Sequence, residues 1–120
     1  MQDQYYFAAI HEKKEPNGHH YMQLHKRTMP KPGPEDVFVK MEACNICTTD
    51  YQQWMGLRDH QGFPMAEGHE FVGIVIAKGE RVSSSINIGD RVGQAYTCCG
   101  YCDACRLGFS SDCENVEGKM

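Results

Sequence analysis

The feature that most constrains this chain is a run of cysteines with the spacing C-x-x-C-x-x-C-x7-C, formed by Cys99, Cys102, Cys105 and Cys113. Gaps this short aim the sulfur atoms at a common point. A closed shell of four thiolates is a common structural arrangement for zinc, with Zn–S distances of about 2.3 Å. Gly100 and Gly108 lie between the cysteines, and glycine accepts the positive φ angles that a tight loop needs. The thiols could instead form disulfides or act as small apolar side chains, but this spacing favours a metal site.

The cysteine count and the charge narrow the class of protein further. The chain has seven cysteines, an odd number, so they cannot all pair as disulfides. Its first residues lack the basic start, apolar stretch and cleavage site of a signal peptide, and no apolar run is long enough to cross a bilayer. We therefore expect a cytoplasmic location with zinc-held thiolates. A formal net charge of -4 and the lack of a Lys/Arg run predict no nucleic-acid partner and no membrane partner.

A chain of 120 residues can bury one core, so we expect a single domain. Its hydrophobic pattern predicts that this domain is mainly β. Apolar or alternating segments, separated by Gly and Pro, predict strands at 5–10, 21–25, 37–43, 71–76 and after a turn at 88–90. The proline-rich segment 30–34 is expected to be a stiff connector. Helical signals occur only at 48–55 and within the cysteine segment. Many short strands with this punctuation favour a small, irregular β-barrel with one or two short helices.

A second group of metal-binding residue types is spread over two segments, Cys47-Thr48-Thr49-Asp50 and Gly68-His69-Glu70. A thiolate, an imidazole and a carboxylate fit a catalytic zinc, which typically has three protein ligands and an open position. Taken singly, each residue has an ordinary role, such as a buried thiol for Cys47 or a helix cap for Asp50. Their joint order with the cysteine cluster favours the metal site. A redox-active Cys44-x-x-Cys47 pair is a weaker alternative, because no βαβ pattern surrounds it.

With these motifs the chain resembles the zinc-containing medium-chain alcohol and polyol dehydrogenases. The resemblance rests on segments 30–34, 45–50, 68–73 and 89–92 and on the four cysteines. It implies that residues 1–120 are the GroES-like catalytic domain of such an enzyme, with a zinc lobe at about 96–114. We expect the dinucleotide-binding domain of the family to be absent from this chain, because there is neither a G-x-G-x-x-G motif nor a strand-helix-strand alternation.

The resemblance also implies roles for single residues. Cys47, His69 and Glu70 would surround the catalytic zinc, and the glutamate binds the metal directly in sorbitol-dehydrogenase-like members but lies only close by in others. Thr49 would take the proton from the substrate hydroxyl. Asp50 would accept a hydrogen bond from an imidazole behind the ligands or cap the short helix. The zinc would polarise the alcohol as hydride leaves for NAD or NADP.

Two residues depart from the pattern of the family. Thr48 stands where members often carry arginine, histidine or glycine. Gln52 stands where many members carry a histidine that passes the proton to solvent, and glutamine cannot shuttle protons. The relay must then use water or another residue. His60 is one candidate, and an exposed loop histidine is its alternative role.

The leading hypothesis is therefore the catalytic domain of a zinc-dependent NAD(P) oxidoreductase that acts on a small alcohol or polyol. We expect the isolated chain to be inactive and the full-length enzyme to be a homo-oligomer. One alternative is a stand-alone zinc-binding module with a structural or interaction role and no turnover. Another is a thiol redox protein that uses Cys44 and Cys47.

Overall fold

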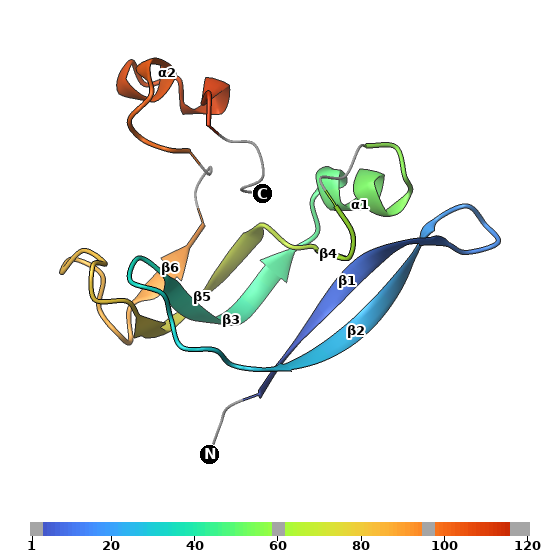
Figure 1. Ribbon diagram of the computed structural model, residues 1–120, viewed down its shortest axis with the longest axis horizontal. Coiled ribbons are helices and arrows are strands. Elements are labelled where there is room, and N and C mark those ends of the chain that lie inside the picture. Colours follow the sequence, from blue (N-terminus) through green and yellow to red (C-terminus); the bar gives the residue numbers. More distant parts are fainter. Residues whose placement is uncertain (1–3, 59–61, 95–97, 116–120) are drawn as a thin grey trace.

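The computed structural model describes residues 4–58, 62–94 and 98–115. Its strands form two antiparallel sheets of three strands each, in the orders β2-β1-β4 and β3-β5-β6. The two sheets lie side by side in Figure 1, with the cysteine segment beyond them. The first sheet contains β1 (Gln4–Lys14), β2 (His20–Thr28) and β4 (Met65–Ala66), and the second contains β3 (Val37–Asn45), β5 (Glu70–Lys78) and β6 (Arg91–Gly93).

The first sheet is built on a long hairpin of β1 and β2. The strands pair from Gln4 opposite Thr28 to Ile10 opposite Met22, and Pro16-Asn17-Gly18 forms part of the turn between them. The strands predicted at 5–10 and 21–25 are therefore confirmed and are longer than predicted. Ala9 and Ile10 are almost fully buried where β1 also pairs with β4. This short third strand leads directly into the Gly68-His69-Glu70 segment.

The second sheet brings together the two segments that carry the predicted site. β3 and β5 pair from Val37 opposite Lys78 to Asn45 opposite Glu70. The residues that follow β3 therefore lie beside the residues that precede β5. The strand predicted at 37–43 is confirmed, but its side chains do not alternate between buried and exposed, and Met41 is 52% exposed. Two register shifts along the β3–β5 pairing break the alternation, as β-bulges do.

The described residues also contain two short α-helices, as the sequence predicted. α1 (Thr48–Trp54) follows β3 directly, and α2 (Asp103–Arg106) lies within the cysteine segment, just before the 3-10 turn η1 (Ser110–Asp112). The end of α1 packs on the β1–β2 turn, where the rings of Trp54 and His19 have centroids 4.2 Å apart. The mainly β class with short helices is confirmed. None of the helices in the described residues is long and apolar enough to span a membrane.

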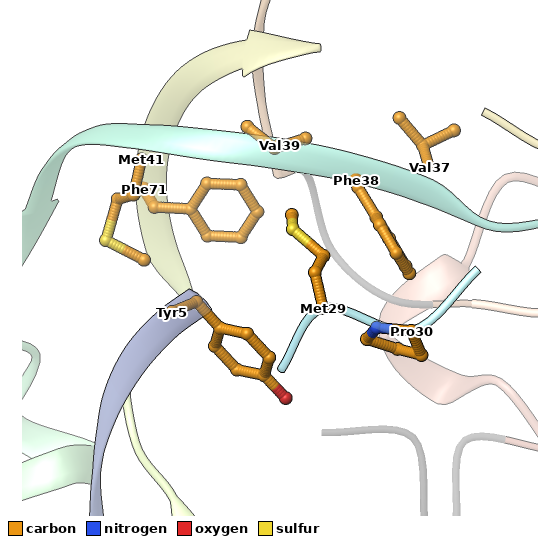
Figure 2. A pocket seen from close by; sticks show the side chains of 8 residues that line it. All are labelled: Tyr5, Met29, Pro30, Val37, Phe38, Val39, Met41 and Phe71. Atoms are coloured by element: carbon orange, nitrogen blue, oxygen red, sulfur yellow. The ribbon is translucent and has the colours of Figure 1, made fainter. Parts of the chain in front are cut away.

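The molecule is thin and its core is small. Its extents are 49 × 45 × 21 Å and its radius of gyration is 16.2 Å, whereas a compact domain of this length has about 13.6 Å. An apolar hollow of about 380 Å³ opens between the sheets. Figure 2 shows Tyr5, Met29 and Phe71 extending into it. Its lining has no cysteine, histidine or carboxylate, so it is separate from the sites described below; it consists of Tyr5, Met29, Pro30, Val37, Phe38, Val39, Met41 and Phe71.

Candidate metal centres

The first candidate site begins at the N-terminus of α1. Cys47 is the N-cap residue of this helix, and its Sγ accepts a hydrogen bond from the backbone N–H of Thr49 at 3.4 Å. In return, Oδ2 of Asp50 accepts a hydrogen bond from the backbone N–H of Cys47 at 2.9 Å. This reciprocal arrangement is a capping box in which cysteine replaces the usual serine or threonine. It fixes the Cys47 sulfur at the start of the helix.

The other two residues of this site come from the start of β5. Gly68 has a φ of +103°, a conformation that residues with a side chain rarely adopt, and a Cβ at this position would lie 3.0 Å from Sγ of Cys44. Asn45 Nδ2 donates a hydrogen bond of 2.9 Å to Oε2 of Glu70, so the end of β3 holds this carboxylate. This hydrogen bond lowers the pKa of Glu70, and a weaker contribution in the same direction comes from a hydrogen bond with the Cys47 side chain.

The sequence-predicted ligands converge. Cys47, His69 and Glu70 each offer one ligand atom, and these atoms all lie within 4.8 Å of one another. A tetrahedral zinc ion with ordinary Zn–S and Zn–N bonds separates its ligand atoms by about 3.3–3.8 Å. Small side-chain rotations would therefore close these residues around one ion. Glu70 is exposed and the other two are half-buried, so one side of the site faces solvent.

The structure shows that Asp50 caps α1, one of the two roles that the sequence left open, and that it also lies beside His69. Oδ2 caps α1, while Oδ1 lies 3.3 Å from Nδ1 of His69. A carboxylate on Nδ1 leaves Nε2 as the nitrogen available to a metal, as in many zinc sites. Burial disfavours the charged form of Asp50, but hydrogen bonds from Glu67 and from the Cys47 backbone hold its pKa below the usual value.

Glu67 is a residue of this site that the sequence analysis missed. Burial, followed by its contact with Asp50, raises the pKa of Glu67 to about 8. At a pKa of about 8, the protonated form of Glu67 predominates at neutral pH and can donate a hydrogen bond to Asp50. With its side-chain amide turned to donate, Gln53 of α1 lies 3.0 and 2.9 Å from the two oxygens of Glu67. The sequence did offer one indication of this role, because Glu67 is an acidic residue directly before Gly68-His69-Glu70.

Thr49 has a partner that the sequence analysis also missed. Its Oγ1 accepts a hydrogen bond of 3.2 Å from Nη1 of Arg58, in the segment after α1. No motif linked these two residues, because the contact depends on how the chain turns after Met55. His60, the candidate for the proton relay, lies outside the described residues.

The second candidate site is the four-cysteine segment. The sulfur atoms of Cys99, Cys102, Cys105 and Cys113 all lie within 4.8 Å of one another, and Cys102 and Cys113 are buried. Backbone N–H groups of the same segment donate to these sulfurs at 3.3–3.5 Å, from Cys99, Tyr101, Cys102, Cys105 and Asn115. Gly100 and Gly108 have φ angles of +78° and +90°, as the spacing predicted. Cys98 is exposed and is not among the converging thiols.

The thiols of this cluster differ in acidity. A hydrogen bond from the Asn115 side chain, aided by backbone N–H groups, lowers the pKa of Cys99 to about 6. The Gly100 backbone favours ionisation of Cys105, but burial and the neighbouring thiols outweigh it and raise the pKa to about 12. The protein's own groups thus favour the thiolate of Cys99 and disfavour that of Cys105. A divalent cation would remove that limit, because thiols give up their protons on binding a metal. All seven cysteines are free thiols in this structure.

Fold and sites together define a mainly β domain with a closed cluster of four thiols and an open Cys-His-Glu cluster. Residues 33–119 match the family model described as the alcohol dehydrogenase GroES-like domain. The chain belongs to this family, which confirms the GroES-like class expected from the sequence.

Individual relatives point the same way. The chain is 41% identical over 97 residues to the L-threonine 3-dehydrogenase of Caldanaerobacter subterraneus subsp. tengcongensis, a match that covers 76% of this chain and 27% of the relative. The cobalt- and zinc-bound thermostable alcohol dehydrogenase from Pyrobaculum aerophilum superposes with a TM-score of 0.73 at 26% identity, over 92% of this chain and 33% of that one. CAD from Helicobacter pylori, complexed with NADP(H), gives a TM-score of 0.73 at 28% identity, over 95% and 32%. The chain thus spans about a quarter to a third of the length of these proteins.

Proposed function

We propose that this chain is the zinc-binding catalytic domain of an NAD(P)-dependent dehydrogenase that oxidises a small alcohol or polyol. Cys47, His69 and Glu70 would hold the catalytic zinc, and the four clustered cysteines a structural zinc. The observation that carries the proposal is the convergence of three different ligand types from two loops, with one side open to solvent. Catalytic zinc sites need such an open position, whereas structural sites are closed by their ligands.

The donor atoms at both sites fit zinc. Thiolate and imidazole are ligands that suit zinc, whereas a hard cation such as Mg²⁺ would require oxygen ligands. Asp50 beside Nδ1 of His69 supplies the carboxylate that commonly orients a zinc-bound histidine. The four sulfurs of the cysteine lobe leave no ligand position for a substrate. This difference supports the division into one catalytic and one structural ion.

Residues of the chain would transfer the proton and orient the zinc ligands. When bound, zinc supplies a Lewis acid that favours the ionised form of the alcohol. Thr49, two residues after Cys47, would accept the proton of the substrate hydroxyl and pass its own proton on. Because Gln52 cannot carry a proton, water would take it to solvent. Asp50 would keep the His69 ring in one orientation, and Glu67 would donate a hydrogen bond to Asp50.

The hydride acceptor would be NAD or NADP, and no G-x-G-x-x-G motif occurs in these 120 residues. We infer that the chain alone binds no cofactor and has no turnover, and that the complete enzyme is a homo-oligomer of the cytoplasm. The alternative of a thiol redox pair at Cys44 and Cys47 has less support. Cys44 lies in β3, and the next strand after α1, β4, belongs to the other sheet, so this segment is not part of a βαβ unit.

Zinc stoichiometry tests the proposal directly. The wild-type chain should bind two zinc ions, and Cys47→Ala and His69→Ala should each bind one, because each removes a ligand of the open site. Cys44→Ser is the matched control, since this exposed thiol is outside both clusters, and it should keep both ions. Two ions in Cys47→Ala and His69→Ala, measured by mass spectrometry under native conditions, would refute the assignment.

A further inference from the structure

We propose that His11 and His25 form a further metal site on the β1–β2 hairpin, for a divalent transition ion with square-planar or octahedral geometry such as Ni²⁺. The Nε2 atoms of the two rings lie 3.0 Å apart. Imidazole nitrogen is a ligand that suits nickel, copper and zinc. Neither histidine belongs to the two clusters described above, so this inference does not depend on the proposed function.

The register of the hairpin explains why two residues 14 positions apart in the sequence meet. His25 stands opposite Phe7, and Gln23 stands opposite Ala9. Because side chains alternate along a strand, Phe7, Ala9 and His11 share one face of β1. Ala9 carries only a methyl group, which leaves the rings of His11 and His25 room to meet across it.

Neighbouring rings hold the two imidazoles in place. Phe7 stacks on His25 with centroids 5.3 Å apart and ring planes 17° apart. The rings of His25 and His11 follow at 5.2 Å, and Tyr21 lies against His11 at 5.9 Å. Both histidines are half-buried, so the pair is packed on the sheet and still reachable from solvent. Ligands fixed in this way lose little side-chain entropy when they bind an ion.

The distance between the nitrogens indicates the type of ion. With metal–nitrogen bonds of about 2.0–2.1 Å, two nitrogens at a right angle lie about 2.9 Å apart, and two at the tetrahedral angle lie about 3.3–3.4 Å apart. The observed 3.0 Å is closer to the right angle, which is the angle of square-planar and octahedral ions. Only two protein ligands are present, with water completing the shell, so binding should be weaker than at either zinc centre.

Binding also requires a change of tautomer. In the hydrogen bond between the rings, one Nε2 carries the shared proton and the other accepts it. Neutral imidazole can carry its proton on either nitrogen, so the donor ring can hold the proton on Nδ1 instead. Both Nε2 lone pairs are then available to the ion, and small ring rotations turn them onto it. No electron is transferred, and no net proton is released.

The test titrates Ni²⁺ into the zinc-loaded chain and records the amide NMR spectrum. Bound Ni²⁺ is paramagnetic, so it should shift or broaden the signals of residues 7–11 and 21–25. His11→Gln and His25→Gln should each weaken binding at the hairpin by about 100-fold, since two ligands on one scaffold gain roughly that factor over one. Mg²⁺ should leave these signals unchanged, because it requires oxygen ligands.

His19→Gln is the matched control. It removes a histidine from the turn of the same hairpin, where the ring lies against Trp54 instead of in the pair, and it should keep the wild-type affinity for Ni²⁺. Undiminished nickel binding at the hairpin in His11→Gln and His25→Gln would overturn the proposal. So would a wild-type chain in which Ni²⁺ affects only the other clusters, a result that does not depend on how the variants fold. The zinc content of the same samples tests the proposed function separately.

Discussion

The two candidate metal centres are ordered by different means. In the cysteine lobe, all four sulfurs and the N–H groups that donate to them belong to residues 99–115. Its large apolar side chains are exposed, with Tyr101 at 68%, Leu107 at 74% and Phe109 at 60%, so it has little core of its own. The open site instead draws its residues from two segments that the β3–β5 pairing and the α1 capping box bring together.

This comparison implies that metal plays a different part at each centre. Where a segment buries little apolar surface, the binding free energy of the metal is largely its folding free energy. The lobe should therefore depend on zinc for its structure. The open site should keep its shape without metal, because sheet pairing and helix capping already hold Cys47, His69 and Glu70 close together.

Cys105→Ser should remove one zinc ion and disorder the lobe while both sheets stay folded. Structural zinc contributes about 10–16 kcal/mol of binding free energy in small zinc-finger peptides, so the loss of one thiolate should be decisive for a segment without a core. Hydrogen exchange should become fast for residues 99–113 and remain slow for β1 and β5. Cys98→Ser, which changes an exposed thiol next to the cluster, is the control and should behave as wild type. An intact lobe in Cys105→Ser would contradict the comparison.

Asp50→Asn should weaken zinc binding at the open site by about 10- to 100-fold, because the partner of a ligating histidine sets its orientation and basicity. The lobe ion should be unaffected. Asparagine can still accept the hydrogen bond from the Cys47 backbone, so α1 should remain folded. Competitive titration against a chelator of known affinity measures the change. If Asp50→Asn kept the wild-type affinity, Asp50 would be a helix cap alone.

Gly68→Ala should destabilise the open site by about 1–3 kcal/mol, since alanine would be strained at a φ of +103°. Its Cβ would also lie 3.0 Å from Cys44 Sγ. Gly89→Ala is a matched control, because Gly89 has a φ of +95° but no atom near the new Cβ. Thermal unfolding of both variants separates backbone strain from steric contact. Equal losses would show that the contact with Cys44 is unimportant.

A small effect is expected from Arg91→Gln, which removes an ion pair between β6 and β3. Arg91 Nε donates to Glu42 Oε2 at 2.8 Å, and this hydrogen bond lowers the pKa of Glu42 from 4.5. A lowered pKa in the folded state means that the pair stabilises the fold above pH 4.5 and loses its effect as the pH falls further. The Tm difference from wild type should thus be small at pH 7 and vanish in acid. Arg81→Gln, whose contact with Glu35 is 3.7 Å, should change Tm less still.

The sequence was sufficient for features whose causes are local. The spacing of the four cysteines and the glycines between them predicted the lobe, because all of its contacts lie within one short segment. The longer strands also followed from local patterns. Glu67 and Arg58 were missed, because their importance depends on which residues the fold brings beside them. β4 was missed as well, since two residues carry no periodicity.

The convergence of Cys47 with His69 could be predicted from the sequence only in part. The residue types predicted a zinc site, and the resemblance grouped these residues. The physical cause of the grouping is the register that places Asn45 opposite Glu70. That register depends on the two bulges in the β3–β5 pairing, which nothing in the alternating pattern of residues 37–43 indicated.

Graded removal of zinc tests the difference between the two centres most directly. The chain is loaded with two zinc ions and titrated with a chelator, while released zinc and the amide NMR spectrum are recorded together. Our account predicts two separate steps. The first ion should leave the open site with small shifts confined to α1 and the start of β5, and the second should leave the lobe as residues 99–113 lose their dispersed signals. Release of the lobe ion first, or unfolding of the open site in the first step, would contradict the account.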